Sequence, residues 1–311
     1  MSQEGPPEPL LALVGPTASG KTEAALEIAQ RMGCEIVSAD SMVVYRRMDV
    51  GTAKPTPSDR ARVSHHLVDV ADPSAPFSVA QYQALALAEI GFIERRGVRP
   101  LIVGGSGLYV RAVVDELDFP GTDPRTRRDL ETEALLAGGS ARLYERLSEL
   151  DPVAAGKIEP ENARRTVRAL EVAAITGRPF SSYATAWEDY PAERVRAAGL
   201  EVPREVLAER IDRRVRAMVE EHEFLEEVRD LVEDGFGVWL TATQAIGYAE
   251  MARHLEGELS LEEAVAATVK RTKALARRQV AWFRRDPRIR WFPAPEGAAA
   301  ITDELTEYLS D

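Results

Sequence analysis

A glycine-rich run near the N-terminus limits the possible folds of this chain more than any other feature. Residues 15–22 match the phosphate-binding pattern G-x-x-x-x-G-K-[ST], with an apolar segment (10–14) before them and apolar residues at helical spacing (22–32) after them. A loop between a strand and a helix directs backbone N–H groups and the positive helix end at a phosphate. Lys21 adds a point charge, and Thr22 offers a hydroxyl to Mg²⁺. The pattern predicts di- or triphosphate binding by Gly15, Pro16, Thr17, Ala18, Ser19, Gly20, Lys21 and Thr22.

The residues after this loop continue to alternate between strand and helix patterns. Short apolar runs at 35–39 and 101–103 predict strands, and 78–96 predicts a helix. Ser78 with Gln81 and Ser260 with Glu263 have the spacing of capping boxes, and glycines at 33 and 97 suit the ends of the helices that precede them. Strands that alternate with helices predict a parallel sheet with helical crossovers.

The pattern changes after residue 121. Residues 123–177 read as helices only, a strand pattern returns at 200–202, and helices dominate again afterwards. We therefore predict an α/β fold, a P-loop NTPase-like parallel sheet flanked by helices, with an all-helical insertion domain. The expected catalytic core comprises 1–121 and 188–311 with C-terminal helices, and the insertion comprises 122–187.

Composition is that of an ordinary globular protein. The 311 residues are 45% hydrophobic and 29% charged, which suits about two domains of roughly 150 residues. The single cysteine, Cys34, excludes an intramolecular disulfide and a cysteine-rich zinc site. The first nine residues do not have the basic and apolar regions of a signal peptide, and no apolar run approaches the length of a membrane span. We expect a cytoplasmic protein that does not enter a membrane.

Charge is unevenly distributed along the chain. The net charge is −12, yet residues 270–290 hold nine Lys or Arg and one acid, Asp286. Such a concentrated basic stretch in an acidic chain suggests contact with a local polyanion. A solvated helix face paired with acidic neighbours is the alternative, and charge alone does not decide between them.

The usual acidic magnesium ligand of a phosphate-hydrolysing protein is not at its expected place. Such proteins carry an Asp at the end of a later strand, but here 101–103 is followed by Gly-Gly-Ser-Gly. The acid follows the second strand instead, at Asp40. Because ligands bind at the carboxyl ends of parallel strands, Asp40 is predicted to face what lies beyond the phosphates. A helix or turn cap is the alternative role.

Motifs distributed along almost the whole chain resemble those of the tRNA isopentenyltransferase (tRNA dimethylallyltransferase) family. They occur in the family's order. They are the P-loop 15–22, Ser-Ala-Asp-Ser-Met at 38–42 with Tyr45, Met48-Asp49, Gly-Thr-Ala-Lys-Pro at 51–55, His-His-Leu at 65–67, Gly-Gly-Ser-Gly-Leu-Tyr at 104–109, Arg165 with Arg-Ala-Leu-Glu at 168–171, Gln-Ala-Ile-Gly-Tyr at 244–248, Arg-Arg-Gln at 277–279, and Trp-Phe-Arg-Arg at 282–285.

The resemblance implies a prenyl transfer. In the family, a dimethylallyl group leaves dimethylallyl diphosphate and joins N6 of the adenosine 3′ to the anticodon of tRNA. The P-loop then holds a diphosphate leaving group, which accounts for the absent acid after 101–103. Mg²⁺ is the implied cofactor, the tRNA anticodon stem-loop is the implied partner, and we expect a monomer.

The resemblance also implies roles for individual residues. Asp40 orients N6 and accepts its proton, while Lys21 and Thr22 with Mg²⁺ stabilise charge on the diphosphate. Arg210 and Arg214 resemble the family's diphosphate-clamping arginines, and we favour Arg214 as the catalytic one, an exposed basic helix face being the alternative. Ser106 stands where most members have Thr and keeps the hydroxyl for the leaving oxygen.

The same resemblance assigns RNA recognition to several segments. Many members have Gln at the position of Val43, so one contact to a base edge is lost here. The basic residues of the insertion and of 270–290 are expected to hold phosphates or splayed bases. The implied tRNA-binding residues are Asp40, Ser41, Met42, Val43, Ser106, Arg127, Arg164, Arg165, Arg168, Gln244, Gly247, Lys270, Arg271, Arg277 and Arg278.

Three other functions remain open from the residues alone. An adenylate isopentenyltransferase would act on AMP and would not need the basic stretch or the insertion arginines. A P-loop small-molecule kinase would need an acidic ligand after a strand, and a nonenzymatic tRNA-binding protein leaves the P-loop and Asp40 unexplained. Trp282 and Phe283 either stack on bases or pack against the core, and His65 with His66 has no apparent third metal ligand.

Overall fold

The computed structural model describes residues 8–183, 189–239 and 241–311. The chain divides into two compact units, one of Met1–Glu116 with Pro191–Asp311 and the other of Leu117–Tyr190. The sequence-based limits of the insertion were 122 and 187, and the second of these lies outside the described residues. Across the described ranges, no helix has both the length and the apolar character needed to cross a membrane.

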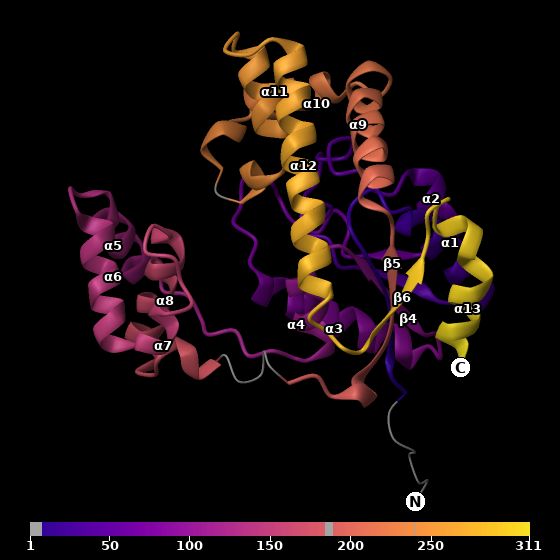
Figure 1. Cartoon of the computed structure of the whole chain (residues 1–311), viewed down its shortest axis with the longest axis horizontal. Helices are drawn as coiled ribbons and strands as arrows, with labels where there is room; N and C mark the ends of the chain where they lie inside the picture. The colour runs from indigo at the N-terminus through magenta and orange to yellow at the C-terminus, as the bar shows by residue number, and fades with distance from the viewer. Residues whose placement is uncertain (1–7, 184–188, 240) are drawn as a thin grey trace, which may run out of the picture. The chain divides into compact units, whose positions relative to one another are not determined.

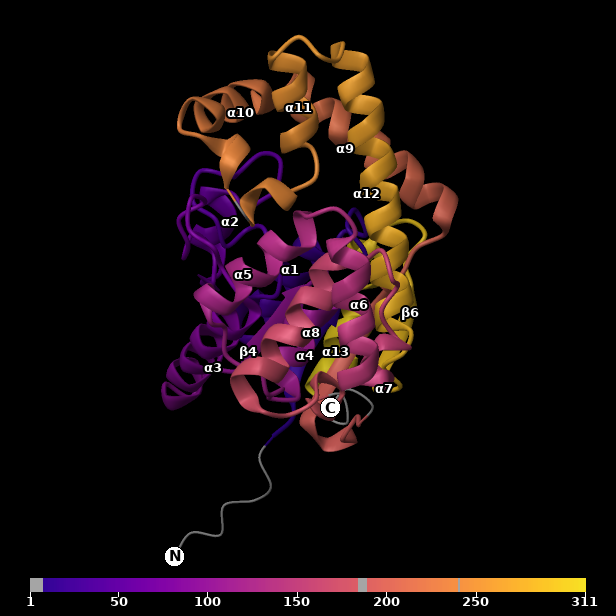
Figure 2. The same cartoon turned by 90° about the vertical axis from the view of Figure 1, so that its left-hand side faces the viewer.

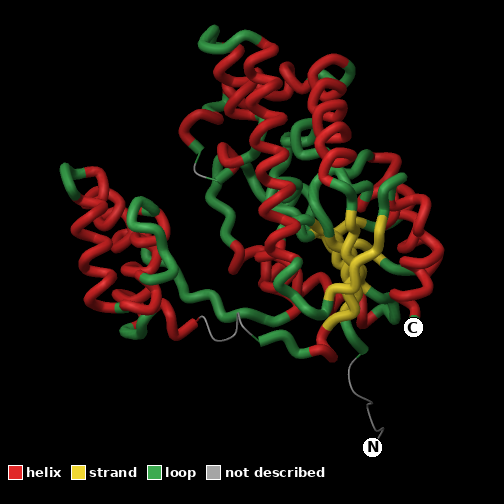
Figure 3. Tube along the Cα trace, viewed as in Figure 1, coloured by secondary structure: helices red, strands yellow, loops and turns green. Residues whose placement is uncertain are grey.

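A six-stranded parallel sheet forms the centre of the larger unit, which confirms the predicted fold class (Figures 1 and 3). Its strand order is β3-β2-β4-β1-β5-β6. The central strand is apolar on both faces because helices cover both sides of the sheet. The strands are β1 (Leu10–Val14), β2 (Glu35–Ser38), β3 (His65–His66), β4 (Pro100–Gly104), β5 (Val195–Glu201) and β6 (Ile289–Pro293).

Helices pack on the two faces of this sheet through separate apolar cores. One face is covered by α1 (Lys21–Met32) and α13 (Thr302–Ser310), and the other by α3 (Val79–Arg95) and α4 (Gly107–Val114). The short α2 (Pro57–Arg62) precedes β3. Cys34 is buried in the α1 core, and Phe283 is buried in the α3 core, as the packing alternative predicted.

Four helices extend the larger unit beyond the carboxyl ends of the strands (Figure 1). They are α9 (Arg204–Glu220), α10 (Phe224–Glu233), α11 (Tyr248–Leu255) and α12 (Leu261–Phe283). Their shared core also takes in Val44, Tyr45 and Met48 from the segment after β2. This segment is therefore attached to helices that lie far along the sequence.

Local capping residues define several helix ends as the sequence indicated. The side chains of Ser78 and Ser260 accept from the backbone N–H groups of Gln81 and Glu263, in capping boxes that begin α3 and α12. Gly33 ends α1 with a φ of 67°, a left-handed conformation that glycine adopts without strain.

The smaller unit consists, in its described part, of helices around a core of its own (Figure 2). Buried Leu130, Leu143, Leu147 and Leu170 come from three of its helices. The helices are α5 (Pro124–Leu135), α6 (Gly139–Leu150), α7 (Pro152–Ala155) and α8 (Ala163–Thr176). This unit therefore has the separate core that an inserted domain needs.

Candidate active site

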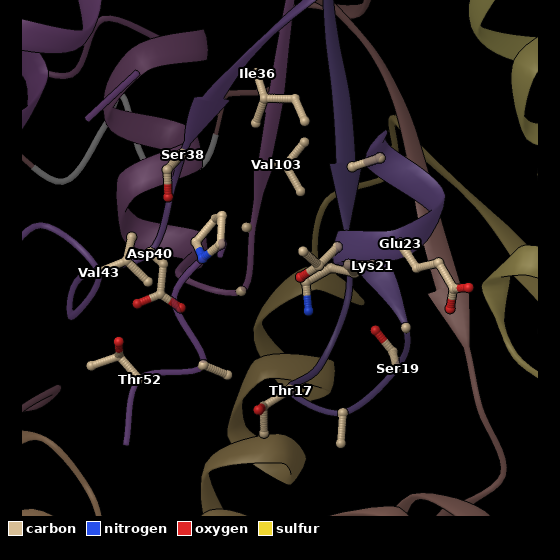
Figure 4. Close-up of a pocket in the computed structure, with 18 of the residues that line it drawn as sticks. Thr17, Ser19, Lys21, Glu23, Ile36, Ser38, Asp40, Val43, Thr52 and Val103 are labelled. Atoms are coloured by element: carbon tan, nitrogen blue, oxygen red, sulfur yellow. The ribbon is translucent and has the colours of Figure 1, made fainter. Parts of the chain in front are cut away.

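A cavity of about 410 Å³ lies at the carboxyl ends of β1, β2 and β4. Ligands of open α/β sheets bind at this edge. Several residues predicted from separate motifs line this one cavity, among them Lys21, Thr22, Asp40, Arg210 and Arg214. Figure 4 shows Asp40 across the cavity from the P-loop residues Thr17, Ser19 and Lys21.

The P-loop turns tightly between β1 and α1. Ala18 and Gly20 have positive φ angles of 63° and 88°, so the backbone bends around the cavity before α1 begins at Lys21. Gly15 and Pro16 are buried at the start of the loop. Ser19 is fully buried, and its hydroxyl has no hydrogen-bond partner among the described residues. A buried orphan hydroxyl beside an N-terminal helix end fits a site that receives an anion.

Lys21 is held over the loop, and its charge is destabilised there. Its Nζ donates to the carbonyl oxygen of Pro16 at 2.6 Å. Desolvation lowers the pKa of Lys21 to about 8, although the carboxylate of Asp40 opposes this shift and the guanidinium of Arg214 adds to it. A bound anion would restore the favourable environment that the ammonium lacks.

Two side chains from distant helices hold Thr17. Arg214 of α9 donates from Nη2 to the Thr17 hydroxyl at 2.7 Å, and Gln279 of α12 accepts the Thr17 N–H at 2.8 Å. Burial lowers the pKa of Arg214, and its Nε has no partner within the described ranges. Arg210 instead donates to the carbonyl oxygen of Pro295 at 2.8 Å. Arg214 thus contacts the P-loop, and its role as the diphosphate-clamping arginine stays a prediction.

Asp40 follows β2 and faces the cavity with one oxygen already oriented. Its Oδ1 accepts the N–H of Met42 at 2.8 Å, in a turn that includes Ser41. This is a local turn contact, but Asp40 also lines the cavity, so both roles considered from the sequence occur together. Val43 lines the same wall.

Gly104, the last residue of β4, allows a close backbone approach to Ala39, the residue before Asp40. A Cβ on Gly104 would lie 2.2 Å from the carbonyl oxygen of Ala39, so no acidic side chain fits at the end of this strand. A Cβ on Gly105 would lie 2.4 Å from Nε2 of Gln279. Ser106 follows, its N–H donates to Ala39 at 3.2 Å, and its hydroxyl does not cap α4.

The wall that continues from Asp40 is held by contacts that the sequence did not indicate. Thr52, Ala53 and Pro55 line the cavity. Lys54 between them is buried, and its Nζ donates to the carbonyl oxygen of Tyr45 at 2.7 Å. The same Nζ also pairs with Asp49 and, at 2.6 Å, with Asp69.

Glu227 of α10 fixes the same wall from its outer side. Its Oε2 accepts the N–H groups of Asp49 and Val50, each at 2.8 Å. Its Oε1 accepts the hydroxyl of Tyr248 at 2.6 Å. Sequence reasoning gave no role to Glu227, Lys54 or Gln279. The partners of Glu227 and Gln279 are distant along the chain. Only the positions of Lys54 and Gln279 within family motifs pointed to these two residues.

In the smaller unit, the four arginines assigned to RNA divide into two kinds. Arg127 and Arg168 both pair with the fully buried carboxylate of Glu171, at 2.6 and 2.7 Å. Arg164 and Arg165 are exposed on α8. The first pair thus has a structural role in this unit.

The basic residues of α12 are also not equivalent. Arg271 pairs with the buried Glu250, whereas Lys270 and Arg277 line a second hollow between α9 and α12. Arg278 is exposed.

The two remaining residues assigned to RNA come before α11. Gln244 is exposed, and Gly247 donates its N–H to Glu250 at 2.9 Å. Gly247 has a φ of 101°, which favours glycine. The tRNA-binding role of all these residues stays a prediction.

His66 is engaged by carboxylates. Its Nε2 lies 2.7 Å from Glu35 and its Nδ1 lies 2.9 Å from Glu89. His65 places its own Nδ1 2.8 Å from the carbonyl oxygen of Val63. The two rings therefore have separate partners and do not form a shared site.

Comparison with known proteins identifies the family. A family model described as IPP transferase matches residues 43–286, and one described as isopentenyl transferase matches residues 9–69. The tRNA dimethylallyltransferases of Streptomyces coelicolor and Moorella thermoacetica are 49% and 45% identical over 306 and 320 residues. These matches cover 98% and 100% of this chain and 96% and 98% of the relatives.

Solved structures give the same result. The tRNA isopentenylpyrophosphate transferase of Bacillus halodurans matches with a TM-score of 0.69 and 39% identity, covering 98% of this chain and 97% of that one. A eukaryotic dimethylallyltransferase acting on tRNA shares the fold at 24% identity, with a TM-score of 0.75 over 93% of this chain and 75% of that one. Because the IPP transferase model matches most of the residues and these relatives match nearly end to end, the chain belongs to the IPP transferase family.

Proposed function

We propose that this protein transfers the dimethylallyl group of dimethylallyl diphosphate to N6 of the adenosine 3′ to the anticodon in tRNA, releasing diphosphate. Relatives that match almost the full chain are named tRNA dimethylallyltransferases. The observation that carries the proposal is that an anion-binding P-loop and the carboxylate of Asp40 face one cavity from opposite walls. Such an arrangement holds a leaving group on one side and an incoming amine on the other.

The P-loop wall is suited to stabilise the leaving group. When the bond between the allylic C1 and the diphosphate oxygen breaks, negative charge develops on the diphosphate. Lys21 and Arg214 line the cavity together with the backbone of the loop, and donors preorganised beside a developing charge are usually the largest catalytic contribution. Ser106 directly follows the lining residues Gly104 and Gly105, and we assign its hydroxyl, which does not cap its own helix, to the bridging oxygen.

Asp40 is suited to manage the incoming amine. N6 attacks C1, and the N6–C1 bond forms as the C1–O bond breaks. The proton that N6 then loses passes to Oδ2 of Asp40 and later to solvent, while Oδ1 remains held by the Met42 N–H. A positioned base of this kind contributes roughly 10²–10⁴-fold to the rate.

The donor set around the P-loop fits Mg²⁺. The Thr22 side chain is exposed to the cavity, and a hydroxyl with diphosphate oxygens and water is the all-oxygen environment that this ion prefers. When bound, Mg²⁺ would offset negative charge on the diphosphate.

The substrate RNA must present a single unstacked adenine to this cavity. The exposed Arg164 and Arg165 of α8, together with Lys270, Arg277 and Arg278 of α12, offer positive charge for phosphates of the anticodon stem-loop. A monomeric state and a cytoplasmic location stay predictions from the sequence.

The kinase alternative is disfavoured by the backbone at the last residue of β4. The contact between Gly104 and the Ala39 carbonyl leaves no room for the acidic magnesium ligand that γ-phosphate transfer needs there. The AMP-specific alternative shares the same cavity, so only the acceptor distinguishes it.

One assay separates these functions. The protein is incubated with Mg²⁺ and dimethylallyl diphosphate labelled in the prenyl group, with either unmodified tRNA or AMP as acceptor. We expect label in tRNA only, with one diphosphate released for each label transferred. Label in AMP but not in tRNA would overturn the proposed acceptor, and release without transfer would indicate a hydrolase.

A further inference from the structure

The cavity continues beyond Asp40 along the surface of the sheet. Val103 of β4 is paired in register with Ser38 of β2, and both line the cavity. Ile36 lies two residues before Ser38, so its side chain is on the same face of the strand. Figure 4 shows Ile36 and Val103 next to each other, at the opposite end of the view from Thr17. We call this part, with Ala25 and His65, the inner end of the cavity.

The inner end is mostly aliphatic, in contrast to the P-loop. Ala25 lies on α1 one turn after Lys21 and is buried, as is Ile36, which pairs in register with His65 of β3. The polar groups here are the Ser38 hydroxyl and the ring of His65, whose Nδ1 already contacts the Val63 carbonyl. One cavity therefore has a cationic end and an apolar end, with Asp40 between them.

We propose that the inner end binds the prenyl tail of the donor and that Val103 limits the length of the tail. This rests on the proposed function, because an allylic diphosphate has the same two parts, a charged group and a short branched hydrocarbon. With the diphosphate in the P-loop and C1 facing Asp40, the methyl-bearing end of the tail extends over Ser38 and contacts Val103 and Ile36.

The acceptor adenine suits the inner end less well. An adenine ring carries several nitrogen acceptors and an amino group, and burying them without hydrogen bonds is costly. The inner end offers few partners for them, whereas a hydrocarbon tail needs none.

The proposal predicts a change in donor selectivity when the inner end is enlarged. For Val103→Ala, the kcat/KM for geranyl diphosphate relative to dimethylallyl diphosphate should rise at least about tenfold over wild type, with tRNA as acceptor. Val37→Ala is the matched control, because it makes the same substitution in the neighbouring strand β2. The Val37 side chain is buried but packs on the opposite face of the sheet. The selectivity ratio of this control should stay within about twofold of wild type.

A second variant and a binding measurement without tRNA test the same proposal. If Val103→Ala does not fold, Ile36→Val removes a single methyl group from the same end and should raise the ratio about threefold. Calorimetric titration of both diphosphates without tRNA should show the same selectivity change in binding. An unchanged ratio in a folded variant would overturn the proposal, and an unchanged ratio with a raised KM for tRNA would instead place the adenine there. Failure of the wild type to prenylate tRNA would refute the proposed function, while the calorimetric ratio would still test the tail site.

Discussion

The two walls of the cavity are built in different ways. The P-loop wall is a continuous segment, of which residues 17–22 line the cavity. The Asp40 wall carries few donors, and it is held in place by Lys54 from within and Glu227 from outside. The difference indicates that the donor is bound largely by one contiguous loop, which Arg214 and Gln279 also hold from distant helices, whereas acceptor positioning depends on a single carboxylate whose surrounding wall is held from α10. Changes to one wall should therefore leave the task of the other intact.

Asp40→Asn is expected to give the largest difference between its effect on catalysis and its effect on donor binding. The amide is nearly isosteric and leaves the P-loop backbone unchanged, but it cannot take a proton from N6. We expect kcat to fall roughly 10³-fold while the Kd for dimethylallyl diphosphate changes less than about threefold. Both are measured well below pH 8, where Lys21 stays charged without the Asp40 carboxylate. Single-turnover kinetics and calorimetry measure the two quantities. Turnover near the wild-type rate would refute the role of Asp40 as base.

The two arginines of α9 provide the next test, on the P-loop wall. Arg214 contacts Thr17, so Arg214→Ala should lower kcat/KM about 10²-fold by removing one donor to the diphosphate. Arg210 contacts the Pro295 carbonyl, so Arg210→Ala should cost about tenfold or less. A larger loss for Arg210 than for Arg214 would show that the wrong arginine has been assigned.

The pH dependence of donor binding should report on Lys21. Because desolvation lowers the pKa of Lys21 to about 8, the unliganded protein loses this charge as the pH rises through that value. The Kd for the diphosphate should be lowest below pH 8 and should rise by up to about tenfold per pH unit above it. Lys21→Met should bind weakly at every pH and remove this dependence. An unchanged slope in that variant would assign the titration to another group.

The smallest effect is expected for Glu227→Gln, on the outer side of the Asp40 wall. The amide keeps one acceptor oxygen but puts an NH₂ group against N–H donors, so the unfolding free energy should fall by about 1–2 kcal/mol. The KM for tRNA should rise about threefold, with the donor Kd unchanged. Glu226→Gln, on the exposed face of the same helix, is the control. A raised Kd for the donor would show that the two walls are not independent.

Features that depend on neighbouring residues could be predicted from the sequence. The strand before the P-loop, the helix after it and the capping boxes at Ser78 and Ser260 are determined by residues within a few positions of each other. Asp40 could be predicted to face the cavity because it follows a strand, and parallel strands end at one edge of a sheet.

Features that depend on distant partners could not be predicted in this way. The edge strands β3 and β6 owe their pairing to β2 and β5, and β3 has only two residues. Arg271 reads as one more cation in a basic run, yet it pairs with Glu250 from another helix. The contact of Gln279 with the Thr17 N–H joins residues 262 positions apart.

A crystal structure with an unreactive thiolo analogue of dimethylallyl diphosphate tests the central claim most directly. The account predicts that the diphosphate accepts hydrogen bonds from the P-loop backbone, Lys21 and Arg214, and that C1 faces the Asp40 carboxylate with space for one amino group between them. A diphosphate bound outside the P-loop, or an Asp40 side chain directed away from C1, would contradict it.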